Sequence, residues 1–144
     1  MEELVPESEI IERTFIMIKP DGVQRGLIGK IIQRFEEKGL KLQNIKMLLS
    51  PENSMMQHYK HLQSRDFFNN YIKYMTSGPV VMMVWEGINA IKIGRIFIGP
   101  TFPEEASPKM IRGNFSMYVR RGVIHASDSI EAANEEIKLW FKNC

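Results

Sequence analysis

Residues 80–85 read VVMMVW, which is the longest uninterrupted apolar run in the chain. Strands that are covered on both faces show such runs, whereas half-exposed strands alternate between apolar and polar residues. A second run of this kind, TFIMI, covers residues 14–18 and is followed at once by Lys19-Pro20. We therefore predict two buried strands, far apart in the sequence, in a small sheet covered by helices.

The segments around these runs predict the other elements. Apolar residues recur at helical spacing between Leu27 and Phe35, and Gly39 is placed to cap the end of that helix. Residues 40–49 alternate imperfectly and favour a strand, and residues 122–126 favour a short one. We expect the remaining helices over 51–62, 66–76, 88–98 and 129–141, with Ser50 and Asp128 as N-caps and Gly99 as a C-cap.

This order of strands and helices indicates a single α+β domain. The chain has 144 residues, of which 44% are hydrophobic and 25% are charged, a composition typical of a folded globular domain. The charge is uneven, because residues 1–12 hold five acids and no base. Residues 13–144 keep 19 bases against 12 acids, which favours anionic partners such as phosphates. We predict an acidic, flexible leader over 1–12 and one domain over 13–144.

The single cysteine, Cys144, allows no disulfide within the chain, and this suits a reducing compartment. No apolar run approaches the roughly 20 residues that a membrane-spanning helix needs. We expect a cytoplasmic protein.

Two common nucleotide-binding signatures are absent. The chain has no G-x-x-x-x-G-K-[ST] loop and no G-x-G-x-x-G fingerprint, and the stretch nearest to the first, residues 26–31, has the wrong spacing. A nucleotide, if bound, is held without a glycine-rich cradle.

Three histidines are candidates for chemistry. His58 and His61 lie three residues apart on an expected helix, which permits a metal pair, but we interpret both as ordinary surface or semi-buried side chains. His125 closes an apolar strand, follows Arg120-Arg121 and precedes a capped helix, whose N-terminus favours anions. His125 either handles phosphate or has a structural role. Lys19, Arg95 and Arg112 are candidate anion ligands by their surroundings, and each can equally be a plain surface cation.

Residues 13–144 resemble nucleoside diphosphate kinases nearly from end to end. The most specific block is His-x-Ser-Asp-Ser at 125–129, combined with K-P-D-x-V-x-R-G at 19–26. The resemblance also rests on further stretches: ERTFIM at 12–17, GLIGKIIQRFEEKG at 26–39, QHY at 57–59, FF at 67–68, YMTSGPVVMMVWEG at 74–87, GR at 94–95, IRG at 111–113 and VIHASDSIEAANEEIKLWF at 123–141.

This resemblance implies a ferredoxin-like fold, in which helices cover an antiparallel four-stranded sheet. It adds an inserted helical hairpin over 51–76 and a long proline-containing loop over 99–113. The implied reaction is the reversible transfer of the terminal phosphate from a nucleoside triphosphate to a nucleoside diphosphate, with broad base specificity. The phosphate is carried as phosphohistidine on His125.

The resemblance also implies the roles of other residues. Glu136 and Ser127 are expected to position His125, and Lys19 acts in both catalysis and phosphate binding. The remaining nucleotide contacts are expected at Tyr59, Phe67, Arg95, Thr101, Arg112, Val119 and Gly122, with Phe67 and Val119 on the two faces of the base. No metal ligand is expected from the protein, and Mg²⁺ is expected to arrive on the nucleotide phosphates.

Several positions depart from the family pattern. Gly122 stands where an asparagine is usual, and Asn114 stands where an aspartate is usual. We therefore expect catalysis that is retained and weakened.

Two alternative functions remain open: a catalytically weakened family member that acts as a scaffold or regulator, and a single-stranded nucleic-acid binder. The latter is suggested by residues 112–119, which faintly match an RNA-recognition strand. The resemblance implies self-association as a homohexamer, with a tetramer as the alternative.

Overall fold

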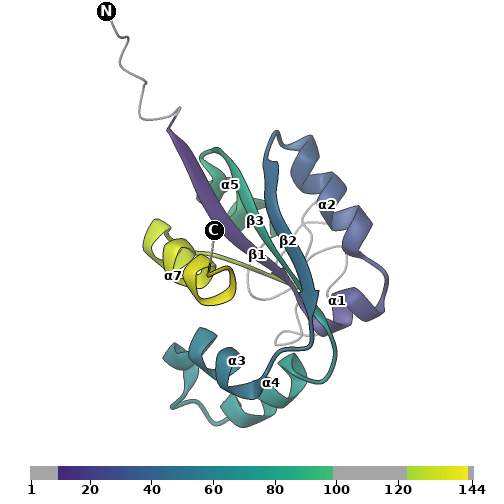
Figure 1. Cartoon of the computed structure of the whole chain (residues 1–144), viewed down its shortest axis with the longest axis vertical. Helices are drawn as coiled ribbons and strands as arrows, with labels where there is room; N and C mark the ends of the chain where they lie inside the picture. Colours follow the sequence, from purple (N-terminus) through teal and green to yellow (C-terminus); the bar gives the residue numbers. More distant parts are fainter. Residues whose placement is uncertain (1–9, 99–122, 143–144) are drawn as a thin grey trace, which may run out of the picture.

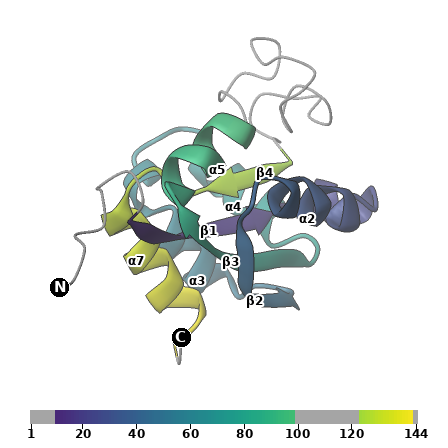
Figure 2. The ribbon, with the colours of Figure 1, turned by 90° about the horizontal axis from the view of Figure 1, so that it is seen from above.

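The computed structural model describes residues 10–98 and 123–142, which form one sheet with helices on both faces (Figures 1 and 2). The four antiparallel strands lie in the order β2-β3-β1-β4. The elements in chain order are β1 (Ile11–Ile18), α1 (Pro20–Gln24), α2 (Ile28–Glu37), β2 (Lys41–Leu48), α3 (Glu52–His58), the 3₁₀ turn η2 (Lys60–Leu62), α4 (Phe68–Met75), β3 (Val80–Ile88), α5 (Ala90–Ile98), β4 (Ile124–Ala126) and α7 (Ile130–Trp140).

The two central strands, β1 and β3, separate two apolar layers. Successive side chains of a strand point to opposite faces, so Ile16 and Ile18 pack with α2 and α5, whereas Phe15 and Met17 pack with α3, α4 and α7. All residues of VVMMVW are almost fully buried, because both faces of β3 are covered. This arrangement confirms the α+β, ferredoxin-like fold and the two buried strands.

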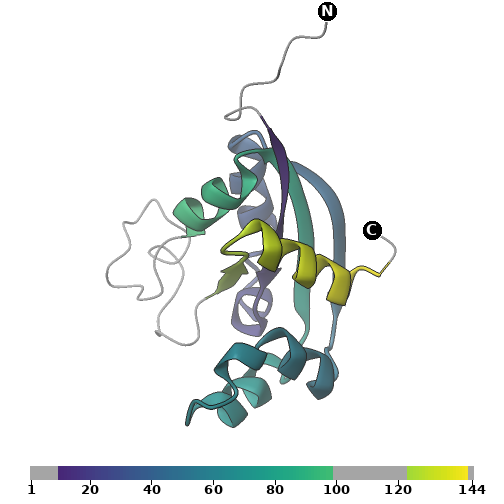
Figure 3. The ribbon, with the colours of Figure 1, turned by 90° about the vertical axis from the view of Figure 1, so that its left-hand side faces the viewer.

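The helical hairpin α3–α4 lies at the end of the sheet where β1 finishes (Figures 1 and 3). Helix α7 packs on the same face of the sheet as this hairpin. This is the hairpin expected over 51–76. The chain leaves β1 at Lys19 and turns into the short helix α1, which has Pro20 at its first position. The sequence patterns did not predict α1, because it is too short to show a helical period.

Some expected boundaries were wrong. β1 begins at Ile11, so Ile11 and Glu12 pair with Ile88 and Gly87 of β3 and are strand residues. Ser129 caps α7, because its side chain accepts a hydrogen bond from the N–H of Ala132, and Asp128 does not have this role. Pro51 occupies the N-cap position of α3 in place of Ser50, whose hydroxyl donates to the carbonyl of Pro51. Gly39 has φ 83°, as the expected cap requires.

Several expectations lie outside the described residues: the leader up to residue 9, Gly99, the loop over 99–113, and the site residues Thr101, Arg112, Val119 and Gly122. None of the helices in 10–98 and 123–142 is both long and apolar enough to cross a membrane.

Candidate active site

His125 is held in the middle of β4, where it pairs with Met17 of β1. Its neighbours Ile124 and Ala126 face the layer of α2 and α5. The alternation of the strand therefore directs His125 to the opposite face, where α3 and α7 lie. The side chain is only partly exposed.

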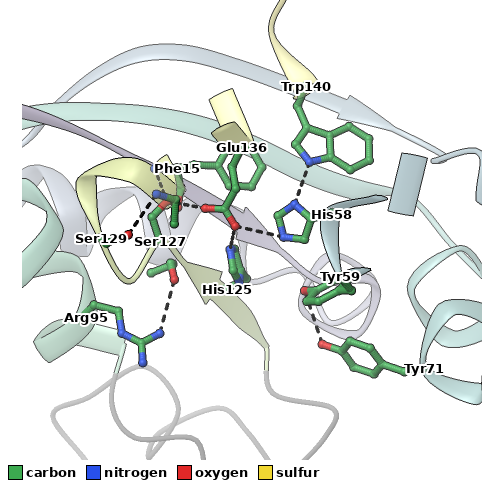
Figure 4. Close-up of polar contacts among 12 residues, drawn as sticks. Phe15, His58, Tyr59, Tyr71, Arg95, His125, Ser127, Ser129, Glu136 and Trp140 are labelled. Atoms are coloured by element: carbon green, nitrogen blue, oxygen red, sulfur yellow. Dashed lines mark hydrogen bonds and ion pairs between the residues drawn. The ribbon is translucent and has the colours of Figure 1, made fainter. Parts of the chain in front are cut away.

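Glu136 on α7 holds His125 and Ser127 together (Figure 4). Its Oε2 lies 2.7 Å from His125 Nε2, and its Oε1 accepts a hydrogen bond of 2.6 Å from the Ser127 hydroxyl. Ser127 is fully buried, and its Oγ also accepts a hydrogen bond of 3.1 Å from the N–H of Phe15. The carboxylate is thus fixed through Ser127 to the central strand. The structure thus brings His125 together with Glu136 and Ser127, the two residues that the resemblance implies as its positioning partners.

The contact with Glu136 determines which ring nitrogen of His125 carries the proton. An ionised carboxylate only accepts hydrogen bonds, so Nε2 of the imidazole carries the proton and the lone pair of the neutral ring is on Nδ1. Burial raises the pKa of Glu136, while the charge interaction with His58 and the hydrogen bond from Ser127 act in the opposite direction. Burying the ionised Glu136 carboxylate therefore costs free energy, which its contacts with His58 and Ser127 partly offset.

His58 is a member of this group that the sequence interpretation missed. It is 8% exposed, and its Nε2 lies 3.4 Å from the same Oε2 of Glu136 that contacts His125. The interpretation as an ordinary surface or semi-buried side chain is wrong for His58, whereas His61 is exposed. A signal was present, because Met55, His58 and Tyr59 share one helical face and are all buried.

The indole of Trp140 fixes the tautomer of His58. Trp140 Nε1 donates a hydrogen bond of 3.0 Å to His58 Nδ1, so the proton of the neutral ring is on Nε2, which faces Glu136. The nitrogen and oxygen atoms of His58, His125 and Glu136 lie within 4.8 Å of one another, close enough to surround a metal ion. However, a metal needs a lone pair on each histidine nitrogen that binds it, and both Nε2 atoms carry protons here. In these tautomers, both imidazoles present an N–H to the Glu136 carboxylate.

His58 should make the protein sensitive to acid. Burial, together with the nearby His125, lowers the pKa of His58 from 6.5 to about 3. Between these values the unfolded chain binds a proton that the folded chain does not, so the free energy of unfolding falls by about 1.4 kcal/mol for each unit that the pH drops. Urea unfolding at pH 7.0 and 5.0 should show a loss about 2 kcal/mol larger in the natural protein than in His58→Asn, which keeps an acceptor near Trp140. An equal loss in both proteins contradicts this assignment.

A cavity of about 670 Å³ opens beside these residues. Its wall includes His125, Glu136, Tyr59 and Arg95, and the guanidinium of Arg95 donates to the carbonyl of Ala126 at 3.4 Å. Arg95 is exposed and Tyr59 is buried. The other two expected nucleotide contacts within the described residues, Lys19 and Phe67, are not part of the cavity wall. Lys19 is buried at the end of β1 and is close enough to lower the pKa of His58, although desolvation contributes more.

Phe67 stands at the N-cap of α4, away from the cavity wall, with its ring edge-on to Tyr71 at 6.3 Å between centroids. This position leaves Phe67 at the tip of the helical hairpin.

Comparison with known proteins agrees with this geometry. The family model described as nucleoside diphosphate kinase matches residues 12–144. Nucleoside diphosphate kinase B of Mus musculus is 56% identical over 132 residues, covering 92% of this chain and 87% of the relative. The crystal structure of the Aquifex aeolicus nucleoside diphosphate kinase superimposes with a TM-score of 0.90 at 40% identity, covering 93% of this chain and 97% of that chain. The Encephalitozoon cuniculi enzyme superimposes with a TM-score of 0.88 at 49% identity, over 90% and 88% of the two chains. The chain therefore belongs to the nucleoside diphosphate kinase family.

Proposed function

We propose that His125 is the nucleophile by which this nucleoside diphosphate kinase moves the terminal phosphate between nucleotides. The observation that carries the proposal is the contact of 2.7 Å between His125 Nε2 and the Glu136 carboxylate at the wall of the cavity. This contact leaves a neutral imidazole with its lone pair on Nδ1, which is a competent nucleophile near neutral pH.

The first half-reaction forms a bond between Nδ1 of His125 and the γ-phosphorus of the triphosphate. The bond from that phosphorus to the β–γ bridging oxygen breaks, and its electron pair leaves with the diphosphate. The ring, now substituted on Nδ1 and protonated on Nε2, gains a positive charge that the Glu136 carboxylate offsets. No proton has to move. The second half-reaction is the reverse with another diphosphate, so the exchange is reversible and the first product leaves before the second substrate binds.

The phosphates are proposed to be bound by Lys19, Arg95 and Arg112, with Tyr59 and Thr101 as neutral donors. Charge-assisted hydrogen bonds of this kind contribute about 1.5–3 kcal/mol each. Phe67 and Val119 are proposed to sandwich the base. Stacking tolerates any base because each base has a π-face, which supports broad base specificity. Gly122 is proposed to lie beside the sugar without a side-chain contact.

Mg²⁺ is proposed to enter as part of the substrate, bound to the nucleotide phosphates. Phosphate oxygens and water are the ligands that Mg²⁺ prefers, and the Nε2 atoms of His58 and His125, which face Glu136, carry protons. Bound to the phosphates, the ion would offset the negative charge that develops on them during transfer. The side chains of the cavity then need only to position the phosphates and the histidine.

A coupled assay with ATP and dTDP tests the proposed reaction. The natural protein should form dTTP only when Mg²⁺ is present, and EDTA should stop the reaction. Incubation with labelled ATP alone should leave an acid-labile phosphate on the protein that later appears in dTTP. A protein that shows no transfer at micromolar concentration contradicts the reaction, and that outcome would favour the scaffold alternative. Family membership disfavours the nucleic-acid binder.

We also propose that the chain assembles as a homohexamer and that it acts in the cytoplasm. The support for assembly is β2, which forms an edge of the described sheet and exposes Ile45 and Met47, followed directly after the strand by the exposed Leu49. Exposed apolar side chains on an edge strand favour pairing with another chain. The presence of a single cysteine supports the reducing compartment.

Charges placed on this edge should break the assembly. Light scattering should give about six times the mass of one chain for the natural protein, and Ile45→Glu with Met47→Glu should give a smaller species. Lys41→Glu, an exposed charge change on the same strand, should leave the mass unchanged. If the double variant keeps the natural mass, β2 is not part of the interface.

A further inference from the structure

Tyr71 of α4 contacts three residues that have different proposed roles in nucleotide binding. Its ring contacts Lys19 of the phosphate side, Tyr59 of the cavity wall and Phe67 of the base side. Residues 69–73 are not part of the stretches that carry the resemblance, and Tyr71 has no role in the reaction as described above. Figure 4 shows Tyr71 beyond Tyr59, with the two hydroxyl groups turned toward each other.

The ammonium of Lys19 lies over the ring of Tyr71, with 5.4 Å between Nζ and the ring centroid. A cation within about 6 Å of an aromatic face is attracted by it, and the attraction grows when the pair is removed from water. Lys19 is only 7% exposed. Its backbone is fixed as well, because its N–H donates to the carbonyl of Val123 at 2.8 Å. Both ends of this lysine are thus held within the folded domain.

An aromatic face is a suitable partner for a cation that has to bind phosphate. A carboxylate would neutralise the ammonium and would compete with the incoming anion, whereas an uncharged ring leaves the full positive charge. Within residues 10–98 and 123–142, no carboxylate forms an ion pair with Lys19. A lysine side chain that moves freely also loses rotamer entropy when it binds an anion. Holding it beforehand reduces that loss.

Tyr71 is itself fixed from several sides. Its ring packs edge-on against Tyr59, with centroids 5.0 Å apart and 79° between the planes, and the two hydroxyls are 3.5 Å apart. One turn further along α4, the hydroxyl of Tyr74 donates to Asp21 of α1, the helix that begins directly after Lys19. This bond ties the helix that carries Tyr71 to the segment that carries Lys19.

We propose that Tyr71 is a positioning residue that holds the Lys19 ammonium, still charged, at the place where nucleotide phosphates bind. The inference rests on the proposed function, since that function makes Lys19 a phosphate ligand. The aromatic ring is the part that acts on Lys19, and the hydroxyl acts only toward Tyr59.

A double-mutant cycle on the binding of Mg²⁺-ADP tests this role without any turnover. Tyr71→Leu should raise the Kd about fivefold to tenfold, and Tyr71→Phe, which keeps the ring, should stay within about twofold of the natural protein. In a Lys19→Met background, Tyr71→Leu should change the Kd by less than about twofold. The exposed Lys73 lies on the same helix, and Lys73→Ala is the matched control with an unchanged Kd. An equal rise in Kd with and without Lys19 shows a merely structural role and overturns the proposal.

A second measurement needs no substitution. In the free natural protein, the NMR signals of the Lys19 ε-methylene protons should be shifted upfield by the ring current of Tyr71. Signals at the positions of an unfolded lysine overturn the proposal even if Tyr71→Leu does not fold. The two hypotheses fail separately: a protein that lacks phosphate transfer refutes the proposed reaction, while an active protein without the coupling refutes only the role of Tyr71.

Discussion

Replacing His125 by alanine should abolish both phosphate transfer and the acid-labile label, lowering the turnover by about 10⁴-fold or more. The size of the effect follows from the chemistry, because the alanine variant has no nitrogen to form the covalent intermediate. Direct transfer between two bound nucleotides is not an alternative route, because the proposed reaction uses one nucleotide position twice. The measurement is the labelling of the protein with γ-labelled ATP, followed by addition of dTDP.

The fold of this variant should be intact, because His125 is on the short strand β4 between two buried neighbours, Ile124 and Ala126. Its melting temperature should therefore stay close to that of the natural protein, which separates loss of chemistry from loss of structure. The exposed Lys73→Ala is a control that should be labelled normally. Label that survives in His125→Ala refutes His125 as the nucleophile while leaving the family assignment untouched.

The fold could be predicted largely from VVMMVW and TFIMI. Both runs are central strands because a sheet that is covered on each face needs no polar alternation. What the sequence did not show was the extent of pairing. Ile11 and Glu12 lie in an acidic region with a weak pattern, yet they are strand residues because β3 is long enough to pair with them through Ile88. Tertiary pairing overrode the local signal.

The site was predictable where it follows a motif. His125 and Ser127 are two residues apart, and Glu136 is on the helix that follows, so their local order already brings them together. His58 was missed because its role depends on α3 packing against α7, and this is a contact between distant segments. Tyr71 was missed for the same reason, because it is on α4 whereas its partner Lys19 follows β1, far away in the sequence. The helical spacing of Met55, His58 and Tyr59 could have indicated that His58 is buried, but no local pattern identifies Glu136 and Trp140 as its partners.

Glu136→Gln should separate activity from stability. The variant keeps the shape of the side chain, and its amide oxygen can still accept from His125 Nε2. Ser127 can adapt, because its hydroxyl already lies 3.3 Å from the carbonyl of Phe15 and can donate there when the amide replaces the carboxylate. The negative charge is lost, however, so nothing on this side chain offsets the charge of the phosphorylated ring. We expect turnover to fall about 10²- to 10³-fold, as when other preorganised electrostatic partners are removed.

The stability of Glu136→Gln should move in the other direction. Burial raises the pKa of Glu136 in the folded protein above its usual 4.5. The protonated form is thus favoured by folding, and its contribution to stability is complete below the unfolded pKa and is lost as the pH rises through the folded one. At pH 7 the ionised side chain is therefore a cost, which the neutral amide avoids. The variant should melt at the same temperature as the natural protein or at a higher one.

The pH dependence of turnover distinguishes this explanation from a simple change of shape. In the natural protein, turnover should decline on the acid side as Glu136 gains a proton, with a midpoint above the usual pKa of a glutamate. In Glu136→Gln this contribution to the acid decline should disappear, because the group that titrates is gone. Glu131→Gln, an exposed acid in the first turn of the same helix, should keep the natural profile. An unchanged acid decline in Glu136→Gln would show that another group controls it and that the carboxylate does not act on His125 through its charge.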